Sequence, residues 1–186
     1  MVKTISRRLM IAFVCVSALL GGIGCNNIAL PPVLVDLPLG GSLSIPGSSN
    51  TSLVGVFCNL LTEAQLDQLL IDAGLQTVAD LVDLDRVVLD ELEFTAAVGA
   101  GDFSGFTRAD FSIIVGVETI VVGSVINPAG LGNSFTIVPN NEIDLLTILE
   151  DGACGGGRLV LTGTAPATAL NYSLTAHLAV YTRLNL

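Results

Sequence analysis

The feature that most constrains the fold is an alternation of apolar and polar side chains close to the C-terminus. Over residues 170–181 the apolar set is Leu170, Tyr172, Leu174, Ala176, Leu178 and Val180, and the set between them is Asn171, Ser173, Thr175, His177 and Tyr181. Because successive side chains of a β-strand point to opposite faces, this alternation predicts a long strand with one buried and one solvated face. Residues 91–98 repeat the pattern, with Glu91 and Glu93 on the polar side and an apolar side that includes Val98.

Shorter apolar segments predict further strands. Residues 111–126 are apolar on both faces apart from Glu118, as expected for one central strand. Residues 135–138 and 158–164 also favour strands. Segments rich in Gly, Asn, Asp and Pro separate these strands at residues 99–105, 127–130 and 151–157. Strands with such links predict a mainly β fold: an antiparallel Greek-key sandwich of the immunoglobulin-like type.

Two short helices are expected over residues 62–84. Thr62 and Gln65 form a capping box, in which the two side chains satisfy backbone groups at a helix start. A second helix is expected over residues 77–84, and a helical turn beginning at Asp144 is expected later in the chain. Helices of this length are not stable alone, so we expect the first two to pack on the sandwich.

The N-terminus has the order of an export signal. Residues 1–8 contain three basic side chains, residues 9–20 are apolar, and small residues then precede Cys25. The sequence ending in Gly24-Cys25 resembles the lipobox of bacterial lipoproteins, although that family usually has Leu where this chain has Gly22. The resemblance implies a signal peptide over residues 1–24 and a diacylated Cys25 at the new N-terminus. An ordinary secretory signal is the alternative, which would leave a secreted or periplasmic protein.

The resemblance also implies a place in the cell envelope. Asn26 stands where lipoproteins retained in the inner membrane usually have Asp, which favours an outer-membrane anchor. Residues 25–52 are rich in Pro, Gly and Ser, and we expect them to form a flexible tether to a single domain over residues 53–186. The apolar residues 33–35 could instead dock as an edge strand.

The charge distribution argues against nucleic acid as a partner. All 17 acidic residues lie beyond residue 35, and four arginines remain after the leader, namely Arg86, Arg108, Arg158 and Arg183. The processed chain, with four basic residues against 17 acidic ones, has a net charge of −13. Such a chain repels nucleic acid and anionic lipid headgroups.

The four cysteines divide by position. Cys15 is removed with the leader and Cys25 would hold the lipid, so Cys58 and Cys154 remain as the pair for a disulfide. Closing this loop of about 96 residues would stabilise the fold by roughly 4–5 kcal/mol on an entropic account. The alternative is two free buried thiols. The spacing of these cysteines and His177 matches no zinc motif.

The sequence contains no pattern that indicates catalysis. A Ser-His-Asp triad would have to use His177, the only histidine, which the strand prediction places on a polar sheet face. Glu91 and Glu93 share a strand face as glycosidase carboxylates can, but the chain has no Trp and two Tyr to form a sugar platform. Nine acids lie between Glu63 and Glu93 without the spacing of a calcium loop, which favours a solubilising face over a Ca²⁺ site. We therefore expect no enzyme activity, no cofactor and no metal.

The body of the chain resembles uncharacterised bacterial lipoproteins with immunoglobulin-like sandwiches, and also late-embryogenesis-abundant proteins of type 2. The resemblance rests on the order of the helical pair, Gly101-Asp102-Phe103-Ser104, Leu161-Thr162-Gly163-Thr164 and a long final strand, and it implies no residue role. The expected function is a non-enzymatic, membrane-tethered binding or structural module. The alternative is a carrier of lipid or another small apolar ligand, suggested by an apolar composition with few aromatic residues. We also expect an edge strand, such as the terminal one, to be available for pairing with a protein partner or a second copy.

Overall fold

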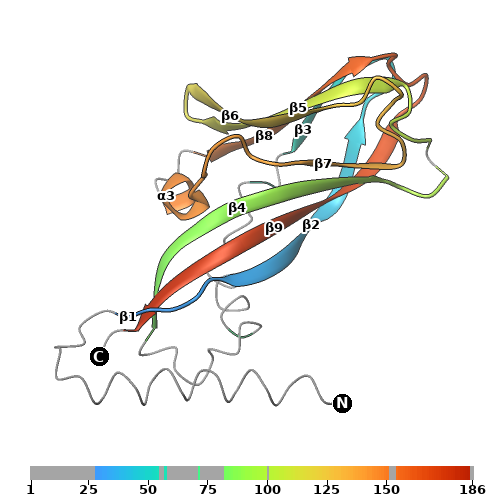
Figure 1. The fold of residues 1–186 in the computed structure, drawn as a ribbon. Helices are drawn as coiled ribbons and strands as arrows, with labels where there is room; N and C mark the ends of the chain where they lie inside the picture. The colour runs from blue at the N-terminus through green and yellow to red at the C-terminus, as the bar shows by residue number, and fades with distance from the viewer. Residues whose placement is uncertain are drawn as a thin grey trace, which may run out of the picture.

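The computed structural model describes residues 28–54, 57, 71, 82–99, 101–150 and 154–184. Within these residues the fold is mainly β, with two antiparallel sheets that face each other as an open sandwich (Figure 1). Sheet A consists of β1 (Ile28–Ala29), β2 (Val33–Ile45), β4 (Val82–Ala96), β7 (Ser134–Ile137) and β9 (Leu170–Leu184). Sheet B consists of β3 (Thr51–Val54), β5 (Phe106–Val115), β6 (Glu118–Ile126) and β8 (Cys154–Gly163). A short helix, α3 (Leu145–Glu150), packs beside β4.

The strands pair as one long ribbon that doubles back on itself. β2 pairs with β9, β3 with β8, β4 with β7 and β5 with β6, so the β5–β6 hairpin is the tip of the ribbon. The paired strands also curl round, so that β4 forms an antiparallel pair with β9 and β5 forms one with β8. The resulting strand orders are β2-β9-β4-β7 and β3-β8-β5-β6, with β1 on the same edge of β9 as β2.

The alternation predicted for the C-terminal strand is confirmed in β9. The even-numbered residues from Leu170 to Val180 are buried, whereas Asn171 and Ser173 are exposed. The terminal strand is nevertheless not an edge, because β2 and β4 occupy its two sides. Among the described strands, the edges of sheet A are β1 and β2 on one side and β7 on the other, so the terminal strand is not the exposed edge that the sequence suggested.

The alternation in β4 is confirmed up to the end of the strand. Leu92 and Phe94 are buried on the inner face, and Glu91 and Glu93 lie on the other face. Val98 does not continue the buried set, because β4 ends at Ala96 and Val98 is fully exposed in the turn that follows.

Aromatic rings fill the space between the sheets. Phe94 of β4 stacks on Phe135 of β7, with ring centroids 4.8 Å apart. Phe111 of β5, in sheet B, also packs on Phe94, with ring centroids 5.8 Å apart. Phe103 and Tyr172 extend the cluster on the side of β9. All five rings are buried, so the few aromatic residues of this chain are concentrated where the two sheets meet.

A buried hydrogen-bond chain joins the sheets beside these rings. The Tyr172 hydroxyl of sheet A donates to Ser52 Oγ of sheet B at 2.9 Å, and Ser52 donates to the Ser44 carbonyl of β2 at 2.8 Å. Burial raises the pKa of the Tyr172 hydroxyl above its usual value, although the hydrogen bond to Ser52 lowers it. The hydroxyl therefore keeps its proton and acts as a donor at neutral pH.

The N-terminal segment differs from the sequence-based expectation. Residues 33–45, expected to belong to a flexible tether, form β2 and pair along β9, so the alternative of a docked edge strand is the one present. The strand extends well beyond residues 33–35 and is bulged between Leu39 and Leu43. Gly and Pro residues obscured a period-two set, in which Val35 and Leu37 are partly buried and Leu39 is buried.

The predicted central strand over residues 111–126 is instead part of a hairpin. β5 and β6 are joined by a two-residue turn, Gly116-Val117, and Gly116 has a φ of 59°. Only glycine adopts this conformation readily at the first turn position, which suits a hairpin of type II′. The turn was missed because its second residue is an apolar Val117, which is fully exposed.

Two further boundaries also change. Residues 82–84 belong to β4 rather than to a helix, and the rest of the predicted helical pair lies outside the described residues apart from Ile71, which is helical. Residues 154–157 belong to β8 rather than to a loop. Gly157 is needed there, because a Cβ at this position would lie 2.4 Å from Cζ of the Phe111 ring.

Removing the middle of the buried hydrogen-bond chain is expected to destabilise the sandwich. Ser52→Ala leaves the Tyr172 hydroxyl and the Ser44 carbonyl without that partner, which should lower the free energy of unfolding by about 1–3 kcal/mol. In a double-mutant cycle with Tyr172→Phe we expect a coupling of about 1 kcal/mol between the two sites. Urea denaturation followed by circular dichroism measures both quantities. Strictly additive effects of the two substitutions would show that this chain does not stabilise the fold.

Candidate functional site

The outer face of sheet A brings the single histidine together with three carboxylates. In strand register, His177 of β9 lies opposite Asp36 of β2 on one side and opposite Glu91 of β4 on the other. Glu93 lies further along β4 on the same face. The four side chains come from three strands that are distant in sequence, so strand pairing alone creates the cluster.

Both ring nitrogens of His177 face acidic side chains. Nδ1 lies 2.7 Å from Asp36 Oδ1, which is a hydrogen-bond distance. Nε2 lies 3.9 Å from Glu91 Oε1 and 3.8 Å from Glu93 Oε2, within the range of an ion pair. The histidine side chain is 23% exposed, whereas that of Asp36 is 75% exposed, so the strands cover the ring more than its partner.

The surrounding charges favour the protonated form of the imidazole. Partial burial lowers the pKa of His177, but the hydrogen bond to Asp36 and the charges of Asp36, Glu91 and Glu93 together raise it above its ordinary value of 6.5. The protonated ring donates to Asp36 and offsets the repulsion among three carboxylates. Without that proton, strand pairing would hold the three carboxylates close together with no positive charge between them.

This geometry supports a salt bridge across β2, β9 and β4. A histidine that activates a nucleophile needs a hydroxyl or thiol within hydrogen-bond reach, and among the described side chains Asp36 is the one to which the ring is hydrogen-bonded. Across the described residues, no group of three or more His, Cys, Asp or Glu could hold a metal ion.

The sequence predicted part of this cluster. His177, Glu91 and Glu93 were all expected on polar strand faces, and the structure brings these three together. Asp36 was missed because the sequence placed it in the tether. The period-two pattern of β2 was the available signal, since it puts Asp36 on the solvated face between Val35 and Leu37.

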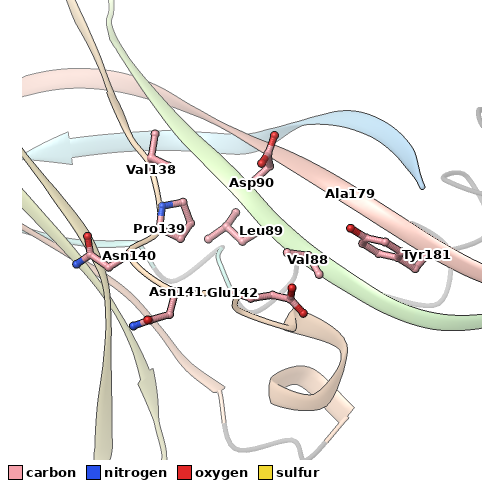
Figure 2. A pocket seen from close by; sticks show the side chains of 10 residues that line it. All are labelled: Val88, Leu89, Asp90, Val138, Pro139, Asn140, Asn141, Glu142, Ala179 and Tyr181. Atoms are coloured by element: carbon pink, nitrogen blue, oxygen red, sulfur yellow. The ribbon is translucent and has the colours of Figure 1, made fainter. Parts of the chain in front are cut away.

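A groove at the edge of β4 is the second candidate (Figure 2). It has a volume of about 360 Å³ and is lined by residues 88–90 of β4, residues 138–142, and Ala179 and Tyr181 of β9. Here the segment after β7 runs beside β4, and Leu89 N–H donates to the Ile143 carbonyl at 3.0 Å. The groove therefore lies at the edge of sheet A, where the segment after β7 runs along β4 in place of a strand.

One carboxylate fixes the wall of this groove to β4. Asp144 Oδ1 accepts a hydrogen bond from the Val87 N–H at 3.2 Å and from the Leu146 N–H at 3.1 Å. The second contact lies at the start of α3 and confirms Asp144 as the predicted helix cap.

The polar groups beside the groove are partly engaged already. Arg86 forms a salt bridge with Glu142, and its guanidinium carbon lies 4.1 Å from the centre of the Tyr181 ring. Asp90 and two asparagines, Asn140 and Asn141, supply the remaining polar lining. This mixed and open surface does not converge on one ligand class.

Of the three cysteines for which the sequence predicts a role, the structure describes Cys154. Cys154, at the start of β8, is disulfide-bonded. Its expected partner Cys58 and the expected lipidation site Cys25 both lie outside the described residues. Among the described residues, no helix has the length and apolar character that crossing a bilayer requires.

Comparisons with known proteins give distant structural matches. No protein-family model matches the sequence, and no curated protein matches it. The decameric BFDV capsid protein is 10% identical with a TM-score of 0.35, over 87% of this chain and 100% of that chain. The Tobacco streak virus coat protein dimer is 10% identical with a TM-score of 0.34, over 79% of this chain and 84% of that chain. The extra small virus particle of the prawn Macrobrachium rosenbergii is 11% identical with a TM-score of 0.24, over 84% and 80% of the two chains. At these values the likeness supports no conclusion on fold or function.

Stability is expected to fall with rising pH through the titration of His177. A pKa that is raised in the folded state gives a stabilisation that is complete below the unfolded value of about 6.5 and is lost as the pH rises through the folded value. We expect His177→Gln to be less stable than the wild type by up to about 1 kcal/mol at about pH 6, and this difference should shrink towards about pH 9. Urea denaturation at a series of pH values measures it, with Ser173→Ala on the same face of β9 as the control. A difference that stays constant over this range would contradict the role of the protonated ring.

Proposed function

We propose that this protein is an exported, lipid-anchored and non-catalytic β-sandwich that serves in the cell envelope as a binding or structural module. The observation that carries the proposal is the engagement of the only histidine by Asp36, Glu91 and Glu93. The side chain on which acid–base catalysis would most readily depend is thereby given a structural role, because it links three strands. The lipid anchor rests on the resemblance of residues 1–25, ending at Cys25, to lipoprotein signals.

The finer description of the fold belongs to the same proposal. The nested pairing of β2 with β9, β3 with β8, β4 with β7 and β5 with β6 supports an eight-stranded jelly roll, which is built from two Greek keys. A jelly-roll order differs from the immunoglobulin-like order expected from the sequence, in which the first two strands are neighbours in one sheet. The expected helices before residue 82 would lie in the connection from β3 to β4.

The disulfide proposed between Cys58 and Cys154 has support from neighbouring residues. Phe57, which precedes Cys58, is buried and packs on Phe111 with ring centroids 5.4 Å apart. A Cβ on Gly157 of β8 would lie 3.4 Å from the Cβ of Phe57. The chain at residue 57 therefore runs close to β8, the strand that begins at the disulfide-bonded Cys154.

The alternative function as a carrier has less support. A carrier needs an internal cavity of about 300 Å³ or more. The middle of this sandwich is occupied by Phe94, Phe111 and Phe135, whose ring centroids are 4.8–5.8 Å apart in successive pairs. The groove of Figure 2 lies at a sheet edge, where it would shield little of an apolar ligand.

Acylation at Cys25 is the test of the proposed function. Expressed in a bacterium with an outer membrane and fed an alkyne-labelled fatty acid, the wild type should incorporate the label and sediment with outer membranes. Cys25→Ser should lose the label and the membrane association, whereas Cys58→Ser is the matched control that keeps the label. If the wild type is cleaved and released without label, it has an ordinary secretory signal and the anchor is wrong.

The disulfide is expected to contribute strongly to stability. Peptide mapping without reductant should recover a peptide pair that joins Cys58 to Cys154. The variant with serine at both positions should lose roughly 4–5 kcal/mol of unfolding free energy on the loop-entropy account, measured against the wild type in urea without reductant. A free Cys58, or a link from Cys154 to another cysteine, would contradict the pairing.

A further inference from the structure

The chain joins sheet A almost immediately after the proposed lipid anchor. β1 begins at Ile28, and its two residues pair with Leu184 and Arg183 at the end of β9. Asn26 and Asn27 alone separate Cys25 from β1, and three extended residue steps span at most about 11 Å. An acyl group on Cys25 would therefore hold this end of sheet A close to the bilayer.

The residues that follow β1 are also attached to sheet A. Leu30 N–H donates to the Thr182 carbonyl at 3.0 Å, which continues the attachment made by β1. β2 then pairs along β9 from Val33 onward. The segment that the sequence suggested as a spacer is thus part of the sheet, and cannot let the domain stand away from its anchor.

The outer face of sheet A displays a particular set of side chains at this end. We call it the anchor-end patch, and it consists of Leu34, Arg86, Tyr181 and Arg183. Arg86 lies opposite Tyr181 in register, and Leu34 lies opposite Ala179 of β9 with 72% of its surface exposed. Figure 1 shows that β1 and the adjoining ends of β4 and β9 project beyond sheet B, and Arg183 belongs to this extension because it pairs with Ala29 of β1.

The chemistry of the patch suits the headgroup region of a bilayer. Tyrosine combines an apolar ring with a polar hydroxyl, and arginine places a guanidinium at the end of an apolar stem. Arg183 pairs with Asp85 at 2.8 Å and Arg86 pairs with Glu142, so both arginines of the patch are offset, and Asp83 opposite Arg183 in register adds one acidic residue at this end. The processed chain as a whole has a net charge of −13, so a patch whose two arginines are each paired can approach lipids with less repulsion than the acidic row of Asp36, Glu91 and Glu93 on the same face.

Acidic side chains limit how far such a contact can extend. Asp36 and Glu91 flank His177 in the next outward-facing row beyond Leu34, and Glu93 follows further along β4. Anionic headgroups repel these carboxylates even where His177 offsets part of their charge. The sheet therefore has to rise from the membrane after Leu34 instead of lying flat upon it.

We propose that the anchor-end patch rests on the headgroups of the bilayer that holds the lipid on Cys25, and that the turn containing Val98 points away from the membrane. This inference rests on the proposed lipid anchor and adds the surface that faces the bilayer and the orientation of the sandwich. The short connection to β1 fixes the position, and the acidic row fixes the tilt.

Single tryptophans can test this orientation, because the chain contains none. Tyr181→Trp places the reporter in the patch and keeps an aromatic ring beneath Arg86. Val98→Trp places it at the far end, where the native side chain is fully exposed. The acylated full protein is reconstituted in phosphatidylethanolamine and phosphatidylglycerol vesicles in which a fraction of the lipids is brominated near the headgroup. Lipid quenching of Y181W should exceed that of V98W by about twofold or more, because an interfacial contact buries side chains roughly 5–10 Å into the headgroup boundary.

A spacer variant provides the control for the short connection. Inserting about ten Gly and Ser residues between Asn27 and Ile28 adds roughly 17 Å of average reach. Acylation and vesicle flotation should be unchanged, while lipid quenching of Y181W should fall towards that of V98W.

The outcomes separate this inference from the proposal on which it rests. Absence of an acyl group on Cys25 by mass spectrometry would overturn both. Acylated, vesicle-bound protein with equal lipid quenching at the two reporters would overturn the orientation alone. Protection of Y181W from acrylamide without lipid quenching, together with a cross-linked dimer, would show that a second copy covers the patch and would also overturn it.

Discussion

The pairing of β9 along both of its edges is the interaction on which the remaining structure depends. β2 lies on one side and β4 on the other, so the last strand joins the beginning of the described chain to its middle. The inner face of β9 supplies a continuous row of buried side chains from Leu170 to Val180. Its outer face places His177 between acids of both neighbours. Core, sheet and charge cluster therefore share a single strand.

Ion pairs in this acidic protein relieve repulsion more than they drive folding. Arg86, Arg108 and Arg183 each pair with a carboxylate, and His177 lies among three. Partly exposed pairs of this kind contribute about 0–1 kcal/mol each. The aromatic cluster is worth more, because burial of a single large ring stabilises a fold by roughly 1.5–3 kcal/mol. The apolar interior holds the sheets together, and the cations allow acidic strands to lie side by side.

The sequence predicted strands best where one face is exposed to solvent and the other is buried. The alternation identified the buried even-numbered residues of β9 from Leu170 to Val180 and the buried Leu92 and Phe94 of β4, although Ala179 is also buried and Val98 is exposed. The contrast was lost in β5 and β6, which are apolar on both sides of a turn that itself contains a valine, and in β2, where Pro38 and two glycines interrupt the pattern. Of the candidate site, the faces of His177, Glu91 and Glu93 were predictable. Their meeting with Asp36 was not, because it depends on the register between strands that are remote in sequence.

The nested pairing also governs the order in which the fold can form. Its outermost pair joins residues 33–45 to the final strand, and contacts so distant in sequence form slowly because a long loop must first close. A chain that emerges N-terminus first, from a ribosome or through a membrane pore, exposes β2 and β4 while the strand that lies between them is still to come. Sheet A lacks its central strand until β9 (Leu170–Leu184) has emerged. A polypeptide with this topology can therefore be threaded through a narrow channel before the pairing that completes sheet A has formed.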